Sequence, residues 1–332
     1  MQALMLKQHG NVDQFELQDI PMPEIKRGYV LIKVAATSVN QVDIKIRNGL
    51  PISPALPGPI GCDAAGTITK IGEGVTGFEV GDAVYGCVAG VKGMGGALAE
   101  YVLADAQLIA KKPVNLSMRE AAAMPLVAIT AWEAIERAHV KKGEAVLVHG
   151  GMGGVGHIAA QLAVQRGARV FVTVSRHRDD ALLRSFGIDG IIDAGKESVE
   201  DYVEKYTEGR GFDVVIDTVG GENLDRSLQA AGLNGRVSAI AARSTHDLSP
   251  MHAKALTLNV IFMLIPMLHD KNREQHGEIL ARIARLVEAG GLKPIVDQTE
   301  FTLQTAPQAH SHLESGQAHG KVVISVSSDA NL

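Results

Sequence analysis

The sequence predicts an α/β protein in which a doubly wound parallel sheet is combined with a second, β-rich domain. Two observations predict the parallel sheet: a glycine cluster lies between an apolar run and a helical pattern at residues 146–163, and apolar runs alternate with helical segments after it. A third observation predicts the β-rich domain, because residues 1–110 form short apolar segments that are broken by glycine and proline.

The glycine cluster has the spacing of a dinucleotide-binding turn. Gly151, Gly153 and Gly156 fall in G-x-G-x-x-G register directly after the apolar run Ala145–His149. The pyrophosphate of a dinucleotide needs a tight turn, a main chain without obstructing side chains, and a helix N-terminus whose amide groups face the charge. The strand before the turn and the helix after it give the motif the context that this interpretation requires.

The segments after the glycine turn predict the remaining strands of the parallel sheet. Apolar runs that fit buried parallel strands are Arg169–Val174, Gly190–Asp193, Asp213–Asp217 and Arg236–Ile240, with Leu258–Phe262 as a potential further strand. Helical segments near 154–166, 179–186, 198–207 and 222–231 separate them. Strands that alternate with helices of this length are typical of a doubly wound sheet.

Both ends of the chain contribute to the expected β-rich domain. Its clearest strands are Tyr29–Thr37, Cys62–Ile71, Asp82–Cys87 and Ala97–Ala104, followed in the tail by Pro294–Leu303 and Lys321–Val326. Ser117 and Glu120 resemble a capping box at the start of a helix, and Glu274–Glu288 predicts another helix. We therefore expect residues 1–124 and 266–332 to form one domain and residues 125–265 to form the nucleotide-binding domain.

Composition and charge exclude several classes of protein. The 332 residues are 46% hydrophobic and 21% charged, which is typical of a globular protein, and a net charge of −5 gives no general attraction to nucleic acid or an anionic membrane. No apolar window approaches the roughly 18 residues of a spanning helix, and the N-terminus lacks the blocks of a signal peptide. Cys62 and Cys87 alone cannot build a disulfide framework, so we expect a reducing, cytoplasmic compartment.

The end of the second parallel strand favours NADP(H) over NAD(H). An NAD-type fold usually places an acid about twenty residues past the glycines, where it binds the ribose hydroxyls. No acid occurs between Phe171 and Arg178, and Ser175, Arg176 and Arg178 stand there instead. Arginine suits a 2′-phosphate by its charge and its fork geometry. The alternative is that these arginines are only solvated loop residues.

Several longer motifs follow one another along the chain: NQVDIKIRNG (40–49), GCDAAGTITKIGEGVTGFEVGDAVYG (61–86), PLVAITAWEAI (125–135), HGGMGGVGHIAAQLA (149–163), DTVGG (217–221) and SHLESGQAHGKVVI (311–324). In this order they resemble the motifs of the medium-chain dehydrogenases/reductases, and most closely those of the zinc-independent quinone oxidoreductase (zeta-crystallin-like) branch. The resemblance implies a GroES-like catalytic domain built from both ends of the chain, a Rossmann domain between them, and a cofactor in the cleft between the domains.

The resemblance also implies that the protein uses no zinc. At the three positions where zinc-dependent relatives carry a Cys, a His and a Cys as catalytic ligands, this chain has Asn40, Cys62 and Leu126. One thiol cannot hold a zinc ion, which takes three protein ligands and a water. Without this Lewis acid an alkoxide has no stabilisation, so alcohol oxidation is disfavoured.

The chemistry that remains is hydride transfer from NADPH to an activated acceptor, either a quinone or an α,β-unsaturated carbonyl. Lys45 stands where many quinone-reducing relatives carry a tyrosine and enone reductases often carry a lysine, which tilts the expectation slightly toward enones. A catalytic Lys45 would donate a hydrogen bond to the substrate carbonyl, and the alternative is a solvated or cofactor-facing lysine. Two other functions stay open: an enoyl- or acryloyl-thioester reductase, and a crystallin-like protein that binds NADPH with little turnover.

The resemblance completes the set of expected site residues and partners. It implies that Asn40 is catalytic and lies near the nicotinamide ribose, that Lys321 approaches the cofactor from the tail, and that Ala194 replaces a tyrosine that relatives often place against the 2′-phosphate. The expected cofactor-binding residues are Asn40, Thr130, Gly151, Gly153, Gly154, Val155, Gly156, Ser175, Arg176, Arg178, Thr218, Ala241, Phe262 and Lys321. A homodimer through the sheet edge near Leu258–Phe262 is also implied, with a small-molecule substrate and no nucleic-acid or membrane partner.

Other conspicuous residues have simpler interpretations. Asp63 and Asp82 are expected to bind nearby main chain in turns or caps. His310, His312 and His319 lie close together in sequence without a carboxylate or thiol to complete a ligand set. We therefore expect surface histidines there, and not a metal site.

Overall fold

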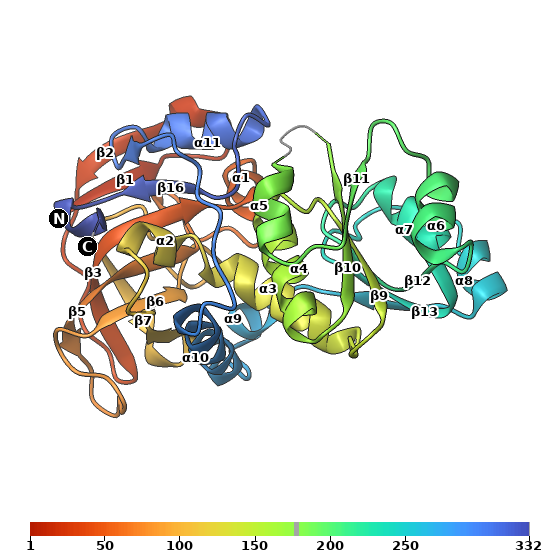
Figure 1. Cartoon of the computed structure of the whole chain (residues 1–332). Coiled ribbons are helices and arrows are strands. Elements are labelled where there is room, and N and C mark those ends of the chain that lie inside the picture. The colour runs from red at the N-terminus through yellow and green to blue at the C-terminus, as the bar shows by residue number, and fades with distance from the viewer. Residues whose placement is uncertain (176–178, 332) are drawn as a thin grey trace. The chain divides into compact units, whose positions relative to one another are not determined.

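The structure is a computed structural model that describes residues 1–175 and 179–331, and the chain in it folds into two compact units. The first unit comprises Met1–Ile129, Leu264–Gly290 and Pro294–Leu332, and the second comprises Thr130–Met263 and Gly291–Lys293. The first unit thus combines both ends of the chain, which carry the two extremes of the colour range in Figure 1. The expected architecture, a β-rich domain from both chain ends and a parallel-sheet domain from the middle, is confirmed.

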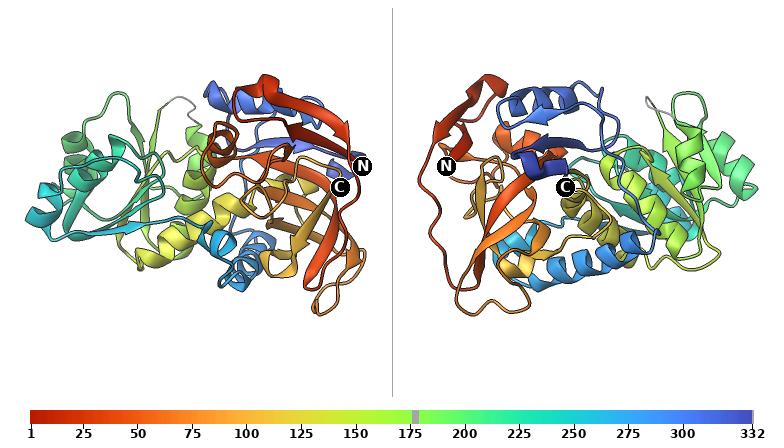
Figure 2. Two further views of the ribbon diagram at one scale, coloured as in Figure 1. Left: turned by 180° about the vertical axis from the view of Figure 1, so that it is seen from behind. Right: turned by 60° about the vertical axis from the view of Figure 1, so that its left-hand side comes forward.

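The first unit is organised around β3 (Tyr29–Val39), a strand of 11 residues. β3 pairs antiparallel with β5 (Asp63–Ile71), β7 (Tyr101–Asp105) and the tail strand β16 (Val322–Ser325). The two views in Figure 2 show the blue tail segments next to the red and orange N-terminal ones. Val322 pairs with Val39, so the start of β16 lies opposite the end of β3.

The other strands of the first unit extend this sheet or form a small second one. The large sheet has the order β15-β16-β3-β5-β6-β8, with β7 on β3, and the small sheet has the order β2-β1-β4. Their bounds are β1 Gln2–Leu6, β2 Phe15–Asp19, β4 Gly58–Pro59, β6 Ala83–Cys87, β8 Ile109–Lys111 and β15 Phe301–Thr302. The helices are α1 Gln41–Arg47, α2 Met118–Ala122, the first turns of α3 Pro125–Arg137, α9 Ile265–His269, α10 Glu274–Glu288 and α11 Ala306–Glu314, with short 3-10 turns at Val12–Gln14, Ala106–Leu108 and Ser328–Asn331.

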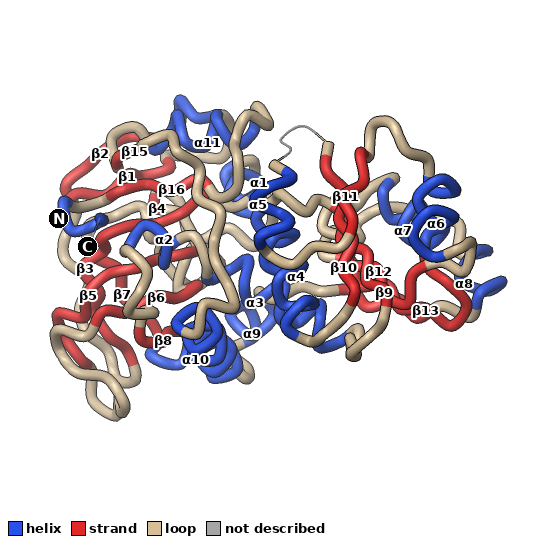
Figure 3. Tube along the Cα trace, in the orientation of Figure 1, coloured by secondary structure: helices blue, strands red, loops and turns tan. Residues whose placement is uncertain are grey.

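The second unit contains a six-stranded parallel sheet with the order β11-β10-β9-β12-β13-β14. The strands are β9 Ala145–His149, β10 Arg169–Val174, β11 Gly190–Asp193, β12 Phe212–Asp217, β13 Ala231–Ala239 and β14 Thr257–Val260, and the helices are α4 Gly154–Gln165, α5 Asp180–Ser185, α6 Val199–Thr207, α7 Asn223–Ala230 and α8 Ser249–Lys254. Figure 3 shows α4 and α5 on one side of the sheet and α6 and α7 on the other. The strand order reverses between β9 and β12, which is where doubly wound folds bind their ligands.

Three expectations about elements need correction. Residues 125–129 belong to the first unit and 291–293 to the second, because the Leu126 amide is bonded to Asp63 and the Lys293 main chain is bonded to Gln161. The expected strand Ala97–Ala104 begins only at Tyr101, and before it Ala99 forms an isolated bridge with Ala3. The expected strand Pro294–Leu303 is reduced to β15 and a bridge at Val296, because the Asp297 carboxylate bonds the local main chain of Thr299 at 2.9 Å.

The hydrophobic and capping predictions are confirmed where they rest on short-range patterns. Ser117 and Glu120 form the expected capping box at the start of α2. The strands β9, β10, β11 and β12 are buried almost throughout, whereas β14 has no buried residue. Phe171 and Phe212 from the strands and Leu224 from α7 belong to one hydrophobic core. No helix among the described residues is long and apolar enough to cross a membrane.

Candidate functional site

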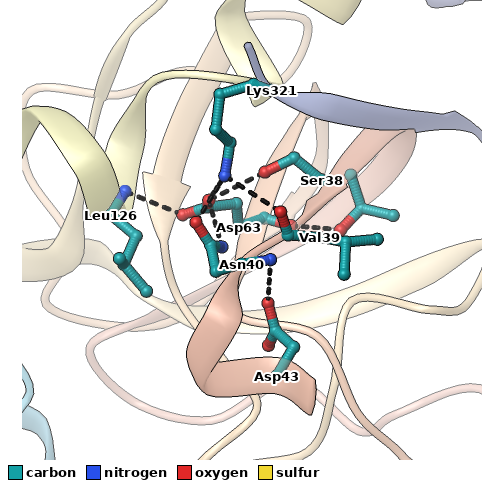
Figure 4. Close-up of polar contacts among 8 residues, drawn as sticks. Ser38, Val39, Asn40, Asp43, Asp63, Leu126 and Lys321 are labelled. Carbon is teal, nitrogen blue, oxygen red and sulfur yellow. Dashed lines mark hydrogen bonds and ion pairs between the residues drawn. The ribbon is translucent and has the colours of Figure 1, made fainter. Parts of the chain in front are cut away.

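A buried polar cluster lies in the first unit where β3 ends and β16 begins (Figure 4). Five side chains define this Asp63 cluster, and each is at most 5% exposed: Ser38, Asn40, Asp43, Asp63 and Lys321. The segments that carry them are far apart in sequence and are brought together by the pairing of β3 with β5 and β16. Charged groups are almost never this buried unless they are paired, so the cluster needs an internal explanation.

Asp63 is the acceptor at the centre of the cluster. Its Oδ2 accepts hydrogen bonds from Oγ of Ser38 at 2.9 Å and from Nδ2 of Asn40 at 2.8 Å, and its Oδ1 accepts one from the Leu126 amide at 2.9 Å. Nζ of Lys321 lies 3.7 Å from Oδ2. Both carboxylate oxygens are therefore satisfied, and the buried charge has a counter-charge.

Asn40 links this carboxylate to the start of α1. Its amide N–H donates to Oδ2 of Asp43 at 2.8 Å, which ties the residue before the helix to the first helical turn. Its side-chain Oδ1 accepts a hydrogen bond from Lys321, and its Nδ2 donates to Asp63. These contacts assign the oxygen and the nitrogen of the carboxamide, and the second Nδ2 hydrogen has no acceptor among the described residues.

Burial opposes every charge in the cluster. Burial raises the pKa of Asp43 to about 6, while the Cys62 thiol opposes this shift and the Asp63 charge adds to it. Burial also raises the pKa of Asp63 against the opposing effect of Lys321, and it lowers the pKa of Lys321 against the attraction of both carboxylates. Asp63 and Lys321 are partners of opposite charge, so each opposes the effect of burial on the pKa of the other.

The substitution Asp43→Asn tests this description, because it keeps an oxygen for the Asn40 amide and removes the ionisable group. With its pKa raised from 3.8 to about 6, Asp43 binds its proton more tightly in the folded protein than in the unfolded chain. As the pH rises from about 4 to about 6, the wild-type free energy of unfolding should therefore fall relative to that of the variant, by ~3 kcal/mol in total. Urea unfolding of both proteins measures this difference, and a difference that does not change with pH contradicts the buried carboxyl.

Lys45, the other expected catalytic residue, does not belong to the cluster. It is exposed on α1, whereas Asp43, Ile44 and Ile46 on the same helix are buried. Among the described residues, no hydrogen bond or ion pair is formed by its ammonium group. Lys45 is therefore available to a ligand but is not held in place by its neighbours.

The glycine turn of the second unit has the geometry that its spacing predicts. A Cβ on Gly156 would lie 2.0 Å from the Gly150 carbonyl oxygen, and a Cβ on Gly151 would lie 2.5 Å from Cβ of Val172. Gly153 precedes the first residue of α4, and Oγ1 of Thr218 donates to the His149 carbonyl at 2.6 Å beside the turn. The turn thus joins strand and helix at a separation that side chains would prevent, and it leaves the first amides of a 12-residue helix facing outward.

Alanine should destabilise the protein at one position of the turn and be tolerated at another. Gly156→Ala brings its Cβ within 2.0 Å of a main-chain oxygen, whereas Gly153→Ala brings its Cβ only within 3.2 Å of the same oxygen. We expect Gly156→Ala to lower the free energy of unfolding by about 3 kcal/mol or more and Gly153→Ala to change it by less than about 1 kcal/mol. Thermal and urea unfolding measure both, and equal stabilities contradict the close approach at Gly156.

A cavity of about 380 Å³ opens near the carboxyl ends of β9, β10 and β11, where His149, Thr173 and Ala194 line it together with α6 and α7. Nδ1 of His149 forms a hydrogen bond with Oγ1 of Thr173 at 3.1 Å, and the same Oγ1 accepts from the Gly150 amide at 3.2 Å. Nε2 of His149 is buried and has no hydrogen-bond partner among the described residues. Burial lowers the pKa of His149 to about 4, so the ring is neutral at pH 7.

The remaining predicted residues are all in the second unit. Thr130 is buried on α3, and Ser175, Thr218, Ala241 and Phe262 follow the strands β10, β12, β13 and β14. Gly154 and Val155 are the first residues of α4. Arg176 and Arg178 lie outside the described residues. The strand expected at Leu258–Phe262 is β14, which ends at Val260, so Phe262 follows this strand and is not part of it.

Sequence reasoning named Asn40 and Lys321 but missed Asp63, the residue at the centre of the cluster. Asp63 was expected to bind nearby main chain, but its partners come from β3, α3 and the tail, whereas Asp82 does bind the nearby Glu79 amide at 2.9 Å as expected. A carboxylate inside an otherwise apolar run was the available signal. The surface expectation for His310 is also wrong, because it is 1% exposed and its ring packs 5.1 Å from that of Phe15.

Comparisons with known proteins place both units in one family. Residues 26–114 match the model of the alcohol dehydrogenase GroES-like domain, and residues 186–324 match a model described as zinc-binding dehydrogenase. A solved structure described as an alcohol dehydrogenase superfamily protein from Novosphingobium aromaticivorans has a TM-score of 0.94 and 38% identity, and the match covers 98% of this chain and 100% of that one.

Curated relatives match over nearly the whole chain. The 2-methylene-furan-3-one reductase of Solanum lycopersicum is 37% identical, and the chloroplastic NADPH-dependent alkenal/one oxidoreductase of Arabidopsis thaliana is 35% identical, each over 98% of this chain and 79% of the relative. The quinone oxidoreductase of Pongo abelii is 31% identical over 98% of this chain and 97% of the relative.

Proposed function

The chain belongs to the medium-chain dehydrogenase/reductase superfamily, and we propose that it is a zinc-independent, NADPH-dependent reductase of quinones or α,β-unsaturated carbonyls. The observation that carries the proposal is the glycine turn between β9 and α4, where neither Gly151 nor Gly156 has room for a side chain. The acceptor class is supported by the names of relatives that reduce a methylene-furanone, alkenals and alkenones, or quinones.

The second unit supplies the groups that would hold NADPH. The first amides of α4, from Gly154 to Gly156, suit the pyrophosphate, whereas the Gly151 and Gly153 amides already donate to the carbonyls of Thr173 and Gly150. Ser175 with the neighbouring Arg176 and Arg178 suits the 2′-phosphate. Thr130, Thr218, Ala241 and Phe262 are assigned to the nicotinamide end. Nε2 of His149, which has no partner among the described residues, supports a ligand with a polar atom in the adjoining cavity. When bound, NADPH supplies the hydride.

The three residues at the zinc-ligand positions of the family, Asn40, Cys62 and Leu126, do not suit zinc. Both ends of the Asn40 carboxamide are engaged by Lys321 and Asp63, and Leu126 has no side-chain ligand atom. The neighbouring Cys87 and burial raise the pKa of the Cys62 thiol well above its ordinary value, whereas zinc binds the thiolate. Reduction of an acceptor that is already activated needs no Lewis acid, and this supports quinones and enones over alcohols.

We assign Lys45 as the group that donates a hydrogen bond to the acceptor carbonyl and Asn40 as the residue that faces the nicotinamide ribose. Hydride addition to an enone leaves negative charge on the carbonyl oxygen, and a nearby ammonium group stabilises it. A homodimer through β14 is also proposed. β14 is the last strand of its sheet. Val260 at its end is 51% exposed, and Phe262 just after it is 43% exposed.

NADPH oxidation by the purified protein tests the function directly. The acceptors are 1,4-benzoquinone, 9,10-phenanthrenequinone, an enone, an enal and crotonyl-CoA, each repeated with NADH and with EDTA. We expect turnover with a quinone, the enone or the enal at a kcat/KM at least tenfold higher with NADPH than with NADH, because the 2′-phosphate adds charge-assisted contacts. EDTA should have no effect. Turnover only with crotonyl-CoA, loss of activity with EDTA, or NADPH binding without turnover would each contradict this proposal.

The role of Lys45 has its own test. Lys45→Met should lower kcat for the preferred acceptor by about 100-fold and leave the KM for NADPH within a factor of two, because the lost contact is made to the developing charge. Lys111→Met, which removes another exposed lysine of the same unit, is the control and should leave kcat unchanged. An unchanged kcat in Lys45→Met would show that this lysine is only solvated.

A further inference from the structure

We propose that Lys321 is a positioning residue that acts through Asn40, and that it is not itself a ligand of the cofactor. The inference rests on the proposed function for its kinetic consequences, but its geometry stands in the first unit alone. Lys321 joins the Asp63 cluster from the tail, where its side chain is 4% exposed (Figure 4).

The Lys321 ammonium group has two hydrogen-bond acceptors, the Val39 carbonyl and Oδ1 of Asn40, and one ion-pair partner, Asp63. Nζ lies 3.3 Å from the Val39 carbonyl, donates to Oδ1 of Asn40 and lies 3.7 Å from Oδ2 of Asp63. An ammonium group has only three donors. Two of these donors form hydrogen bonds, the third hydrogen has only the 3.7 Å ion pair, and the side chain is 4% exposed, so it is burial that keeps the ammonium group from a bound molecule.

The main chain holds Lys321 in this position from both sides. Its N–H donates to the Ile295 carbonyl at 2.9 Å, and its carbonyl accepts from the Asp297 amide at 2.9 Å. Gly320 before it has a φ of +83°, and a Cβ there would lie 2.4 Å from the Ile295 carbonyl oxygen. The next residue enters β16 opposite Val39. The lysine is thus fixed in register with the end of β3.

The charge of Lys321 determines which end of the Asn40 carboxamide faces which neighbour. While Lys321 is charged, Asp63 remains a carboxylate, which accepts from Nδ2 of Asn40 and repels Oδ1. If the lysine were neutral or absent, two buried carboxyls would share the cluster without a cation, and a protonated Asp63 could donate to Oδ1 and turn the carboxamide over. With the carboxamide in this orientation, the second Nδ2 hydrogen of Asn40 is the donor of that side chain that remains for a bound ligand.

Two variants separate the charge from the hydrogen bond. Lys321→Met removes both, whereas Lys321→Gln keeps a donor for Oδ1 of Asn40 without the charge. Arg273→Met is the matched control, because it breaks another partly buried ion pair of the same unit, Arg273 with Asp105 at 2.9 Å, away from Asn40. Each variant is made in the full-length chain, and its unfolding curve establishes that it folds.

The first readout is the side-chain amide signal of Asn40 in ¹⁵N-labelled protein, which needs no activity. We expect two separate, slowly exchanging Nδ2 protons in the wild-type protein, and a shift or loss of these signals in Lys321→Met but not in Arg273→Met. Unchanged Asn40 signals in Lys321→Met would overturn the proposal. This readout judges the inference even if the wild-type protein reduces none of the acceptors, which would refute only the proposed function.

The second readout is a double-mutant cycle in kcat/KM. Lys321→Met should lower kcat/KM by about 10- to 100-fold, the range expected for the loss of a hydrogen bond to a charged group. The loss of kcat/KM in Lys321→Gln should be smaller than in Lys321→Met, and it should decrease as the pH rises and Asp63 ionises. In an Asn40→Ala background, Lys321→Met should have almost no further effect, because its action passes through Asn40. Equal losses in both backgrounds would show that Lys321 acts on the ligand itself or only on stability.

Discussion

The buried pair of Asp63 and Lys321 is the constraint on which the first unit depends. A carboxylate with 0% exposure can remain charged only if hydrogen bonds and a counter-charge replace water. Asp63 obtains these from β3, from the residue after it, from the start of α3 and from the tail. The Asp63 side chain therefore holds together four segments: its own strand β5, the end of β3, the start of α3 and the tail.

This constraint explains why the tail must return to the N-terminal sheet. The contact between Lys321 and Asn40 spans 281 residues of sequence, and the pairing of β16 with β3 brings the two together. The second unit depends on a different and more local constraint. There, close approach of the main chain at Gly151 and Gly156 sets the separation of β9, β10 and α4.

This difference between local and distant contacts explains which features the sequence could predict. The glycine turn, the capping box at Ser117 and the alternation of strands and helices depend on neighbours within a few residues, and all three were predicted. The role of Asp63 could not be predicted, because its partners include residues 23 and 63 positions away whose side-chain directions are set by the fold. The tail strand was overpredicted because apolar spacing carries no information about the Asp297 carboxylate, which turns the chain instead.

The most direct test of this account is the coupling between Asp63 and Lys321 in the free energy of unfolding. Lys321→Met and Asp63→Asn each leave a buried partner without its counterpart, so each should cost about 3–5 kcal/mol. The double variant removes both charges and should cost several kcal/mol less than the sum of the two. Additive losses in urea unfolding at pH 7 would show that the pair does not hold the first unit together.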